Sequence, residues 1–471
     1  MLRRPGSYAI LAVLLLAGCA SPRDPDLRLP AAFEALGGAP AGALALDTWW
    51  TAYGDPELTA LIEQALARNP DIRTARSRLD EVRAQRTSAI LQYLPQGDAT
   101  LQGRRTDTDQ IGGSAANIPG FSTAGVSKQY QGNFTVQWEV DPWGRGFVAY
   151  RAADAEVDRV RYAYEVARAQ LAAETADTWF EAKGLAIQLA DARETARIQQ
   201  GLYDLAAKRS ERGLAPSTEP DRIAGDLAQA NAQVAALEAQ LQVQKRALLV
   251  LAGRIVEPTA NINATPDVGE APAVPQVLPS ELLQRRPDVR QAQAAVRSAA
   301  AQQKLAGLAF FPSFTLSPGL GWSRIEQPGF SSETQNWSIG GSVMQPILSI
   351  PRLMSELKVQ NARAEQAVTA YEKTVQTAFQ EAEGALVSLD ADRRRVTLLT
   401  AGEARARRAF EAARTGYARG LTDLTSTLQA EQSWRAVRAQ LTSAQVQALR
   451  RSVQAMKAIG GGWPAQTYAA K

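Results

Sequence analysis

An α+β fold made of two tandem structural repeats is what this 471-residue sequence predicts. Three observations support it. Short motifs recur at offsets of about two hundred residues, runs of alternating apolar and polar residues come in pairs, and long proline-free segments show coiled-coil spacing. Together they predict that each repeat places a strand pair between a helix and a very long helix, which a shorter helix then follows.

Composition excludes several kinds of chemistry. The chain has 52 Lys and Arg against 48 Asp and Glu, no histidine, and Cys19 as its one cysteine. These counts exclude Ser-His-Asp and Cys-His catalysis, imidazole metal ligands, internal disulfides and Cys-ligated clusters. Carboxylates such as Glu139 and Asp141 show no paired acid–base arrangement, and no basic cluster interleaves with aromatic residues. We therefore expect no enzyme activity, no metal, no cofactor apart from covalent lipid, and no nucleic-acid partner.

The N-terminus predicts export and lipidation. Residues 1–18 combine a basic start with an apolar stretch too short to span a bilayer, as in a signal peptide. The stretch ends Leu16-Ala17-Gly18-Cys19, which resembles a bacterial lipobox. The resemblance implies that Cys19 becomes the mature N-terminus and carries diacylglycerol and an N-acyl chain. Ala20 stands where Asp would favour inner-membrane retention, so the outer membrane is expected. The alternative is an ordinary signal peptide with an incidental cysteine.

The segment 19–54 is predicted to begin as an extended tether, because the stretch to about Pro40 is rich in Pro, Asp, Gly and Ala. The two repeats follow, at 55–260 and 261–471. Asn69-Pro70-Asp71-Ile72-Arg73 matches Arg286-Pro287-Asp288-Val289-Arg290, and Arg212-Gly213-Leu214 matches Arg419-Gly420-Leu421. Gly253 matches Gly460 at the same offset as the second pair. A period this long indicates an internal duplication, not a solenoid.

Each repeat is predicted to contain three helices. Pro70 and Pro287 suit the first helical position, where the missing N–H costs no hydrogen bond. The long helices lack internal proline and span on the order of 100 Å each. The expected ranges are about 70–93, 145–211 and 220–252 in the first repeat, and about 287–309, 352–418 and 422–458 in the second.

The return helices show coiled-coil spacing. The first row is Ile223, Leu227, Ala230, Val234, Leu237, Leu241, Leu248 and Leu251, and the second is Ala430, Trp434, Val437, Leu441, Ala444, Ala448, Ala455 and Ala458. A solitary coiled-coil rod is one interpretation. Each long helix, however, is about as long as the two short ones of its repeat placed end to end. That arithmetic favours one long helix flanked by two stacked short ones.

The strand pairs, at about 97–141 and 313–346, alternate between apolar and polar residues. In the first pair the apolar positions include Leu101, Tyr130, Phe134, Val136 and Trp138. In the second pair they include Phe314, Leu316, Leu320, Trp337 and Ile339. Long loops are expected within the pairs, at Ile111–Lys128 and Ser323–Thr334, because these stretches are rich in Gly, Ser, Asn and Pro.

Runs of about 10 residues are the length that crosses a bilayer as a tilted strand, and aromatic residues at apolar positions suit an interfacial girdle. The alternative, a soluble sandwich, would need a core that covers the apolar face. Four strands cannot close a lipid-facing barrel alone, and open edges are not tolerated in lipid. Oligomerisation is therefore expected, and a trimer with 12 strands or a dimer with 8 would both give allowed barrels.

Two stretches resemble the outer membrane factor (TolC-like) family, and the NodT-type efflux lipoproteins match best. The first is Leu278–Arg290 followed by Phe311-Pro312-Ser313, and the second is the strand-to-helix junction Trp138–Arg145. The resemblance implies a homotrimeric membrane channel, with a shared 12-stranded outer-membrane β-barrel to which each chain gives four strands. It also implies a long periplasmic α-helical coiled-coil barrel, and a mixed equatorial region built partly from residues near Trp49 to Glu57 and the C-terminus.

The resemblance also assigns roles to the helical turns. The Arg212-Gly213-Leu214 and Arg419-Gly420-Leu421 turns correspond to tips that dock a periplasmic membrane-fusion adaptor, although a Gly turn alone would account for them. Asp423 is the candidate periplasmic gate, because three copies in a trimer would form a carboxylate ring that favours cations. The alternative is a helix N-terminal Asp stabilised by the helix dipole. Thr422 departs from the family's acidic ring, and this weakens the gate assignment.

The leading functional hypothesis is the passive exit duct of a tripartite efflux pump, in the outer membrane, lipid-anchored and extending into the periplasm. No GxxxxGK[ST] motif occurs, so energy must come from a partner, an inner-membrane resistance-nodulation-division transporter. The alternatives are a type I protein-secretion channel and a structural periplasmic coiled-coil lipoprotein. The exported cargo cannot be inferred from the sequence.

Overall fold

The computed structural model describes residues 24–34, 45–109, 125–213, 216–275 and 277–464. The chain divides into two compact units. The first contains residues 80–159 and 293–370 and carries the strands, and the second contains residues 26–79, 160–292 and 371–471 and is helical. Within the described ranges, no helix is both long and apolar enough to cross a membrane.

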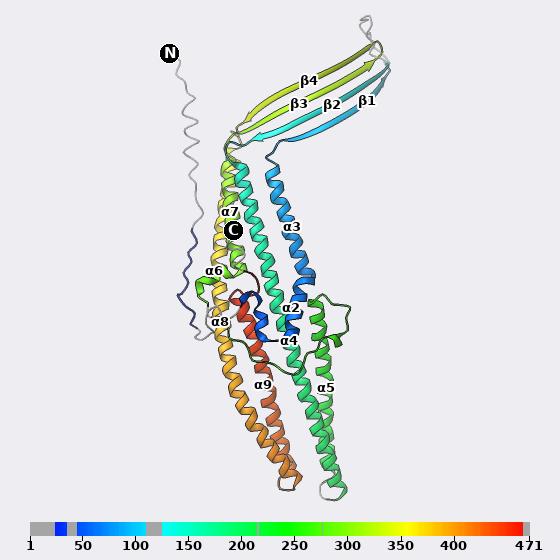
Figure 1. Cartoon of the computed structure of the whole chain (residues 1–471), viewed down its shortest axis with the longest axis vertical. Helices are drawn as coiled ribbons and strands as arrows, with labels where there is room; N and C mark the ends of the chain where they lie inside the picture. Colours follow the sequence, from blue (N-terminus) through cyan, green and yellow to red (C-terminus); the bar gives the residue numbers. More distant parts are fainter. Residues whose placement is uncertain (1–23, 35–44, 110–124, 214–215, 276, 465–471) are drawn as a thin grey trace. The chain divides into compact units, whose positions relative to one another are not determined.

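The first unit contains one four-stranded sheet in the order β1-β2-β3-β4, with every neighbouring pair antiparallel (Figure 1). The strands are β1 (Gln96–Thr108), β2 (Gly125–Val140), β3 (Ser313–Gln327) and β4 (Phe330–Met344). Phe134 pairs with Ala99 on one side and with Leu320 on the other, and Leu320 pairs with Trp337. The apolar positions of both repeats therefore share one face.

The loop expected at Ser323–Thr334 is wrong. β3 continues to Gln327 and β4 begins at Phe330, so only Pro328 and Gly329 connect them. Polar side chains pair across the two strands where the loop was expected: Trp322 donates to Glu333 at 2.8 Å, and the hydroxyls of Ser323 and Thr334 lie 2.8 Å apart. Backbone pairing thus continues where the composition indicated a loop. Of the other expected loop, Ile111–Lys128, residues 111–124 lie outside the described residues, and Gly125–Lys128 belong to β2.

Arg145, the first residue of α4 (Arg145–Glu211), joins strand and helix in the first unit. Its guanidinium donates to the carbonyls of Leu308 at 3.0 Å and Phe311 at 2.8 Å, and it pairs with Glu139 at 3.2 Å. Trp143 stacks on Phe311 with ring centroids 4.9 Å apart. The strand-to-helix junction Trp138–Arg145 therefore holds the end of β2 against the end of α7 (Pro287–Leu308).

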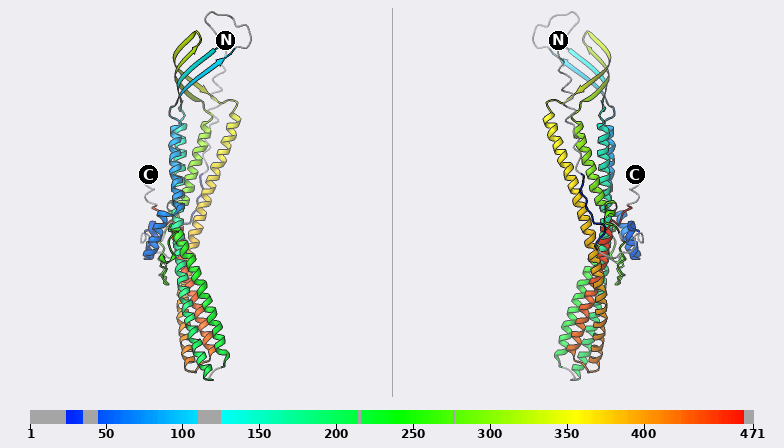
Figure 2. Two further views of the ribbon diagram at one scale, coloured as in Figure 1. Left: turned by 90° about the vertical axis from the view of Figure 1, so that its right-hand side faces the viewer. Right: turned by 90° about the vertical axis from the view of Figure 1, so that its left-hand side faces the viewer.

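Long helices belong to both units. Within the first unit α3 (Pro70–Leu91) lies beside α4, where Arg86 pairs with Asp154 at 2.8 Å. Within the second unit α5 (Thr218–Leu251) lies beside α4, where Arg193 pairs with Glu238 at 2.6 Å. The remaining long elements are α8 (Ile350–Ala418) and α9 (Leu424–Ala458), visible from two further directions in Figure 2.

The coiled-coil rows contribute to the core of the second unit. In α5 the row buries Ile223, Ala230, Leu237, Leu241 and Leu248, and in α9 it buries Leu441, Ala444, Ala448, Ala455 and Ala458. One helix of this core was not anticipated from the sequence: α2 (Pro56–Arg68) buries Leu58, Leu61, Ile62 and Ala65. The short elements are η1 (Leu46–Tyr53), η2 (Thr259–Asn261), η3 (Pro279–Glu281) and α6 (Leu282–Arg285).

The two repeats use the same clamp to hold a helix end. Asn69 donates to the carbonyl of Leu251 at the end of α5, and Arg286 donates to the carbonyl of Ala458 at the end of α9, each at 3.1 Å. Both side chains are buried. Because the last carbonyls of a helix have no partner within the helix, each clamp satisfies a group that would otherwise be unpaired.

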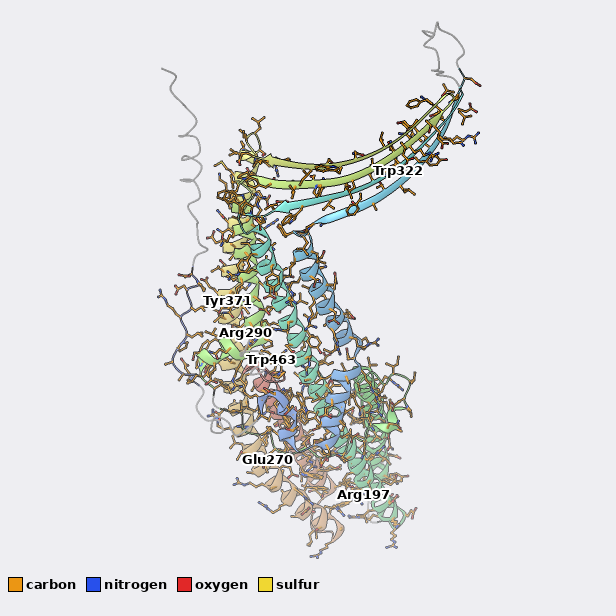
Figure 3. All side chains as sticks on the ribbon, turned by 45° about the horizontal axis from the view of Figure 1, so that its top comes forward. Arg197, Glu270, Arg290, Trp322, Tyr371 and Trp463 are labelled. Carbon is orange, nitrogen blue, oxygen red and sulfur yellow. The ribbon has the colours of Figure 1, made fainter. Side chains whose placement is uncertain are left out.

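Arg286 makes more contacts than Asn69. It also donates to the carbonyl of Ala378 on α8 at 3.3 Å, and it pairs with Asp288 at 2.6 Å and Glu381 at 2.7 Å. A buried charge is tolerated only when it is paired and hydrogen-bonded, and Arg286 meets both conditions. Nearby, Arg290 donates to the Tyr162 hydroxyl at 3.1 Å, and the Tyr162 ring meets Trp463 edge-on. Arg290 and Trp463 are labelled in Figure 3.

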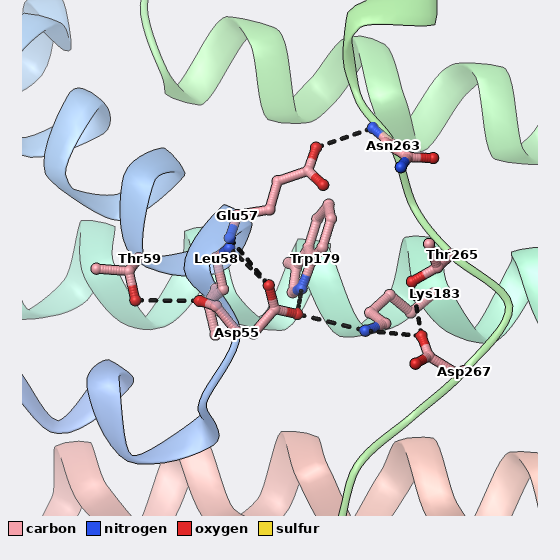
Figure 4. A network of polar contacts seen from close by, with 9 residues as sticks. All are labelled: Asp55, Glu57, Leu58, Thr59, Trp179, Lys183, Asn263, Thr265 and Asp267. Atoms are coloured by element: carbon pink, nitrogen blue, oxygen red, sulfur yellow. Dashed lines mark hydrogen bonds and ion pairs between the residues drawn. The ribbon is translucent and has the colours of Figure 1, made fainter.

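The N-terminal part of the second unit is fastened by Asp55 (Figure 4). Its side chain caps α2 by accepting from the backbone N–H groups of Glu57 and Leu58. It also accepts from Trp179 at 2.9 Å and from Lys183 at 3.3 Å, both on α4. Lys183 pairs in addition with Asp267 at 3.2 Å, so one buried ammonium joins α2, α4 and the loop after η2.

We predict that Gly460→Ala destabilises the protein more than Gly420→Ala. Both glycines have a positive φ, of 85° and 72°, which alone costs a residue with a side chain about 1–2 kcal/mol. A Cβ at Gly460 would also lie 2.7 Å from the Arg285 carbonyl oxygen, whereas none of the described atoms lies within 4 Å of one at Gly420. Overpacking should add about 1–3 kcal/mol. Thermal unfolding of both variants in detergent checks this, and equal losses would contradict it.

Candidate functional site

The sheet of the first unit has one apolar face. It carries Leu101 on β1, the row Tyr130, Phe134, Val136 and Trp138 on β2, Leu316 and Leu320 on β3, and Trp337 and Ile339 on β4. The chain itself covers this face poorly: Leu101 is 86% exposed and Trp337 77%. An apolar face this exposed must meet lipid or another protein surface.

The opposite face is polar. Its residues are mainly Gln, Asn, Ser, Thr and Gly, with Asn133 and Thr135 on β2 opposite Gly321 and Gly319 on β3. On β4 the same face carries Ser338, Gly340 and Ser342. A face of small and polar side chains suits a water-filled lumen.

The apolar band, meaning the rows of apolar residues on the apolar face, is followed by charged residues at the end of the sheet where β3 turns into β4. Lys128 pairs in register with Glu326, and Arg324 pairs in register with Tyr130 and Glu333. Arg324 and Glu326 also form an ion pair at 2.7 Å. On β2 the apolar row runs from Tyr130 to Val140, which is 11 residues and matches a tilted strand that crosses a bilayer.

The first and last strands of the sheet each have one free edge. β1 pairs only with β2, and β4 pairs only with β3, among the described residues. Their outer N–H and C=O groups would each cost several kcal/mol if left unpaired in lipid. The sheet therefore needs strands from other copies to complete it.

The two Arg-Gly-Leu turns lie at the ends of helices in the second unit. Gly213 follows α4 with a φ of 71°, and Gly420 follows α8 with a φ of 72°. After Gly420, the Leu421 N–H donates to the Gly416 carbonyl at 2.8 Å, which is the bond of a Schellman helix ending. Leu421 is 76% exposed, and its partner in the other repeat, Leu214, lies outside the described residues, as does Cys19.

Asp423 is the N-cap of α9. Its carboxylate accepts from the Ser426 N–H and from the Ser426 hydroxyl, each at 2.8 Å. These hydrogen bonds hold the pKa of the exposed Asp423 carboxyl below its usual range. The capping role that the sequence left open is thus present, and it also keeps the carboxylate charged. The helix begins at Leu424, two residues later than expected, because Asp423 serves as its cap.

Segments near both ends of the chain meet in the second unit. Gly462 donates its N–H to the Leu46 carbonyl at 2.8 Å, and Trp463 donates to the Arg285 carbonyl at 2.7 Å. Trp49 and Trp463 are both buried. This agrees with the expectation that residues near Trp49 to Glu57 and the C-terminal part share one region.

Sequence reasoning missed a buried hydrogen bond between the repeats. Glu431 on α9 accepts a hydrogen bond from Gln199 on α4 at 2.9 Å, and both side chains are buried. The only signal was weak: Glu431 follows Ala430 of the coiled-coil row, where a charged residue usually faces solvent.

The family model for outer membrane efflux proteins matches residues 61–254 and 278–461, one match in each repeat. The chain is 29% identical to the pyoverdine export outer membrane protein OpmQ of Pseudomonas aeruginosa, over 96% of each chain. It is 25% identical to nodulation protein T of Rhizobium leguminosarum bv. trifolii, again over 96% of each chain.

The fold agrees with these matches. The solved outer-membrane channel OprN superimposes with a TM-score of 0.80 at 24% identity, over 94% of this chain and 99% of that one. The predicted fold class, that of the outer-membrane channels with four strands per chain, is confirmed, as is the outer-membrane location. The family is one of channels and not of enzymes. The protein is a member of the outer membrane efflux protein family.

Proposed function

We propose that three copies of this chain form the passive exit duct of a tripartite pump, which carries small molecules from the periplasm to the cell exterior. The observation that carries the proposal is the four-stranded sheet with one apolar face, one polar face and two open edges. If β1 of one chain pairs with β4 of the next, three chains close a 12-stranded barrel with no edge left in lipid.

The helical unit supports the same closure. α4 contacts both α5 and α9, and α9 contacts α8, where Trp434 donates to Glu403 at 2.9 Å. α5 leaves Val243 and Val250 exposed, and α8 leaves Val387 and Leu398 exposed. We infer that α5 of one chain packs against α8 of the next, which buries these apolar side chains and closes a helical barrel.

We infer the transport partners from the absence of an energy source in this sequence. Its sequence has no nucleotide-binding motif, so an inner-membrane transporter must supply the energy, and a periplasmic adaptor must connect the two. We propose a resistance-nodulation-division transporter. The relative OpmQ is named for pyoverdine export, and we extend to this chain only the class of cargo, a small molecule.

We also propose that Cys19 carries diacylglycerol and an N-acyl chain, which anchor the mature chain in the outer membrane beside the barrel. The lipobox-like Leu16-Ala17-Gly18-Cys19 supports this. The mass of the purified mature chain tests it, because lipidation adds three acyl chains and removal of the signal peptide subtracts residues 1–18.

Phe134→Arg should prevent membrane assembly, whereas Thr135→Arg should not. The two residues are neighbours on β2 but face opposite sides of the sheet. An arginine toward lipid at mid-membrane depth costs about 2–4 kcal/mol in each chain, and an arginine in a water-filled lumen costs little. The measurement is the yield of trimer from the outer membrane, with the particle mass determined by light scattering. If only Thr135→Arg lost the trimer, the Thr135 face and not the Phe134 face would meet lipid, and this result would contradict the proposed duct.

Leu421→Ser should weaken adaptor binding about tenfold or more without changing the trimer. Leu421 is an exposed leucine on a helical turn, and burying such a side chain contributes about 1.5–3 kcal/mol. Arg408→Ser, at an exposed position on α8 away from the turn, is the matched control. Binding of the purified adaptor to the immobilised trimer measures the effect. If Leu421→Ser and Arg408→Ser bound the adaptor with equal affinity, the Arg419-Gly420-Leu421 turn would not be part of the docking site.

Asp423 is proposed to line the periplasmic gate, and two variants separate its charge from its capping role. Asp423→Asn keeps an acceptor for Ser426 but removes the charge, and Asp423→Ala removes both. If the charge closes the tip, both variants raise single-channel conductance and lower cation selectivity. A change in Asp423→Ala alone would indicate a cap and nothing more.

A further inference from the structure

A buried carboxyl group connects the two helical hairpins of the chain. Glu431 on α9 is fully buried, and Gln199 on α4 is 1% exposed. The Gln199 amide donates to one oxygen of Glu431, Oε2, at 2.9 Å. α4 belongs to the first repeat and α9 to the second, so this hydrogen bond joins the α4–α5 hairpin to the α8–α9 hairpin.

The Gln199–Glu431 contact leaves two buried oxygen atoms without a hydrogen-bond donor. Glu431 Oε1 and Gln199 Oε1 are both buried acceptors, and neither receives a hydrogen bond from any described residue. A carboxylate has no proton to give, so Glu431 in its charged form cannot satisfy the amide oxygen of Gln199. A protonated Glu431 can donate to that oxygen while it accepts from the amide NH2, which gives the paired hydrogen bonds of a carboxylic acid with a carboxamide.

Charged groups of both signs lie on the Glu431 helix and on the helices packed with it. On its own helix, Arg435 Nε lies 3.6 Å from Glu431 Oε1, and this Nε makes no hydrogen bond within the described structure. On α5, Arg222 and Asp226 line the same cavity as Gln199. On α8, Glu403 lies 3.9 Å from Arg438, which itself pairs with Asp191 of α4 at 3.1 Å. Burial and the charge of Asp226 raise the pKa of Glu431, while Arg435 and Gln199 oppose them.

A polar cavity lies against Gln199, on one side of this contact. This cavity of about 450 Å³ lies between α4, α5 and α9, and its wall includes Gln199, Asp226 and Arg435. A polar cavity of this size holds many water molecules. The carboxyl group is therefore buried within the contact but close to a route for proton exchange.

We propose that Glu431 is a proton-sensitive link between the two helical hairpins. When Glu431 takes up a proton, the Gln199–Glu431 pair gains its second hydrogen bond, the buried charge disappears, and the α4–α9 contact tightens. When Glu431 loses the proton, the Gln199 amide oxygen is left without a donor, Glu431 Oε1 keeps only its 3.6 Å ion pair with Arg435, and the contact loosens.

The direction of the pH dependence follows from linkage. In an opened contact the carboxyl is hydrated and has its ordinary pKa, whereas in the closed contact the pKa is raised, so the closed contact binds the proton more tightly. Stability of the contact is complete below the ordinary pKa and is lost as pH rises through the raised one. Between the two values, one linked proton changes the opening equilibrium by up to about tenfold for each pH unit.

The effect on transport rests on the proposed duct function, but the link itself does not. The hairpins end at the Arg-Gly-Leu turns, which are the proposed docking and gating end. If the tips must move apart for the duct to open, a tighter contact between the hairpins at acid pH should lower the open probability.

Hydrogen–deuterium exchange of the purified trimer tests the link, with protection of α9 peptides around Glu431 measured from about pH 5 to about pH 8 and corrected for intrinsic rates. In the wild type, protection should fall as pH rises. In Glu431→Gln, whose amide can both donate to and accept from Gln199, protection should stay high at every pH. Protection that does not depend on pH in the wild type, or the same dependence in Glu431→Gln, overturns the proposal.

Two charge variants separate a proton-sensitive link from a merely structural contact. Asp226→Asn removes a repulsive charge and should move the midpoint to lower pH, whereas Arg435→Gln removes an attractive one and should move it to higher pH. Midpoints that do not move, or that move in the opposite directions, also overturn the link.

Single-channel recording over the same pH range tests the expected fall in open probability at acid pH. A trimer that shows the exchange behaviour but conducts no ions would contradict the duct and leave the link standing.

Discussion

The open edges of the sheet are the constraint on which the rest of the structure depends. Backbone groups along β1 and β4 have partners on one side only among the described strands, and lipid offers none on the other. One chain therefore cannot insert alone. Other features agree with a barrel that only neighbouring copies of the chain complete. They are the apolar and polar faces of the sheet, the charged end of the apolar band and the exposed valines of α5.

Within each chain, the duplicated clamp holds the ends of the return helices. Asn69 and Arg286 occupy equivalent positions and donate to equivalent carbonyls, although one is a neutral amide and the other a charged guanidinium. The larger Arg286 also reaches Ala378 and Glu381 of α8. The duplication thus kept the hydrogen bond that a helix end requires, while the second repeat added contacts to a further helix.

The helical unit combines firmly packed regions with a polar region. Around Trp179 and Trp463 the core is aromatic and fully buried, and both indole N–H groups are hydrogen-bonded. Gln199 and Glu431, by contrast, each bury an oxygen that has no hydrogen-bond partner among the described residues. Partly satisfied polar groups contribute less to stability than apolar packing does. The contact between the hairpins is therefore the part of this unit where a small change, such as one proton, can alter the balance between two arrangements.

The sequence by itself determined the repeats, the long helices, the two faces of the sheet and the glycine turns, because each depends on local periodicity or on one residue's conformational freedom. Only the tertiary structure decided the burial of α2, the extension of β3 to Gln327, the acceptors of Asn69 and Arg286, and the burial of Glu431 against Gln199. All of these except the extension of β3, which pairs with β4 across a two-residue turn, depend on a partner far away in the chain. Periodicity shows which side of a helix or strand is apolar, but it does not show which distant group lies opposite.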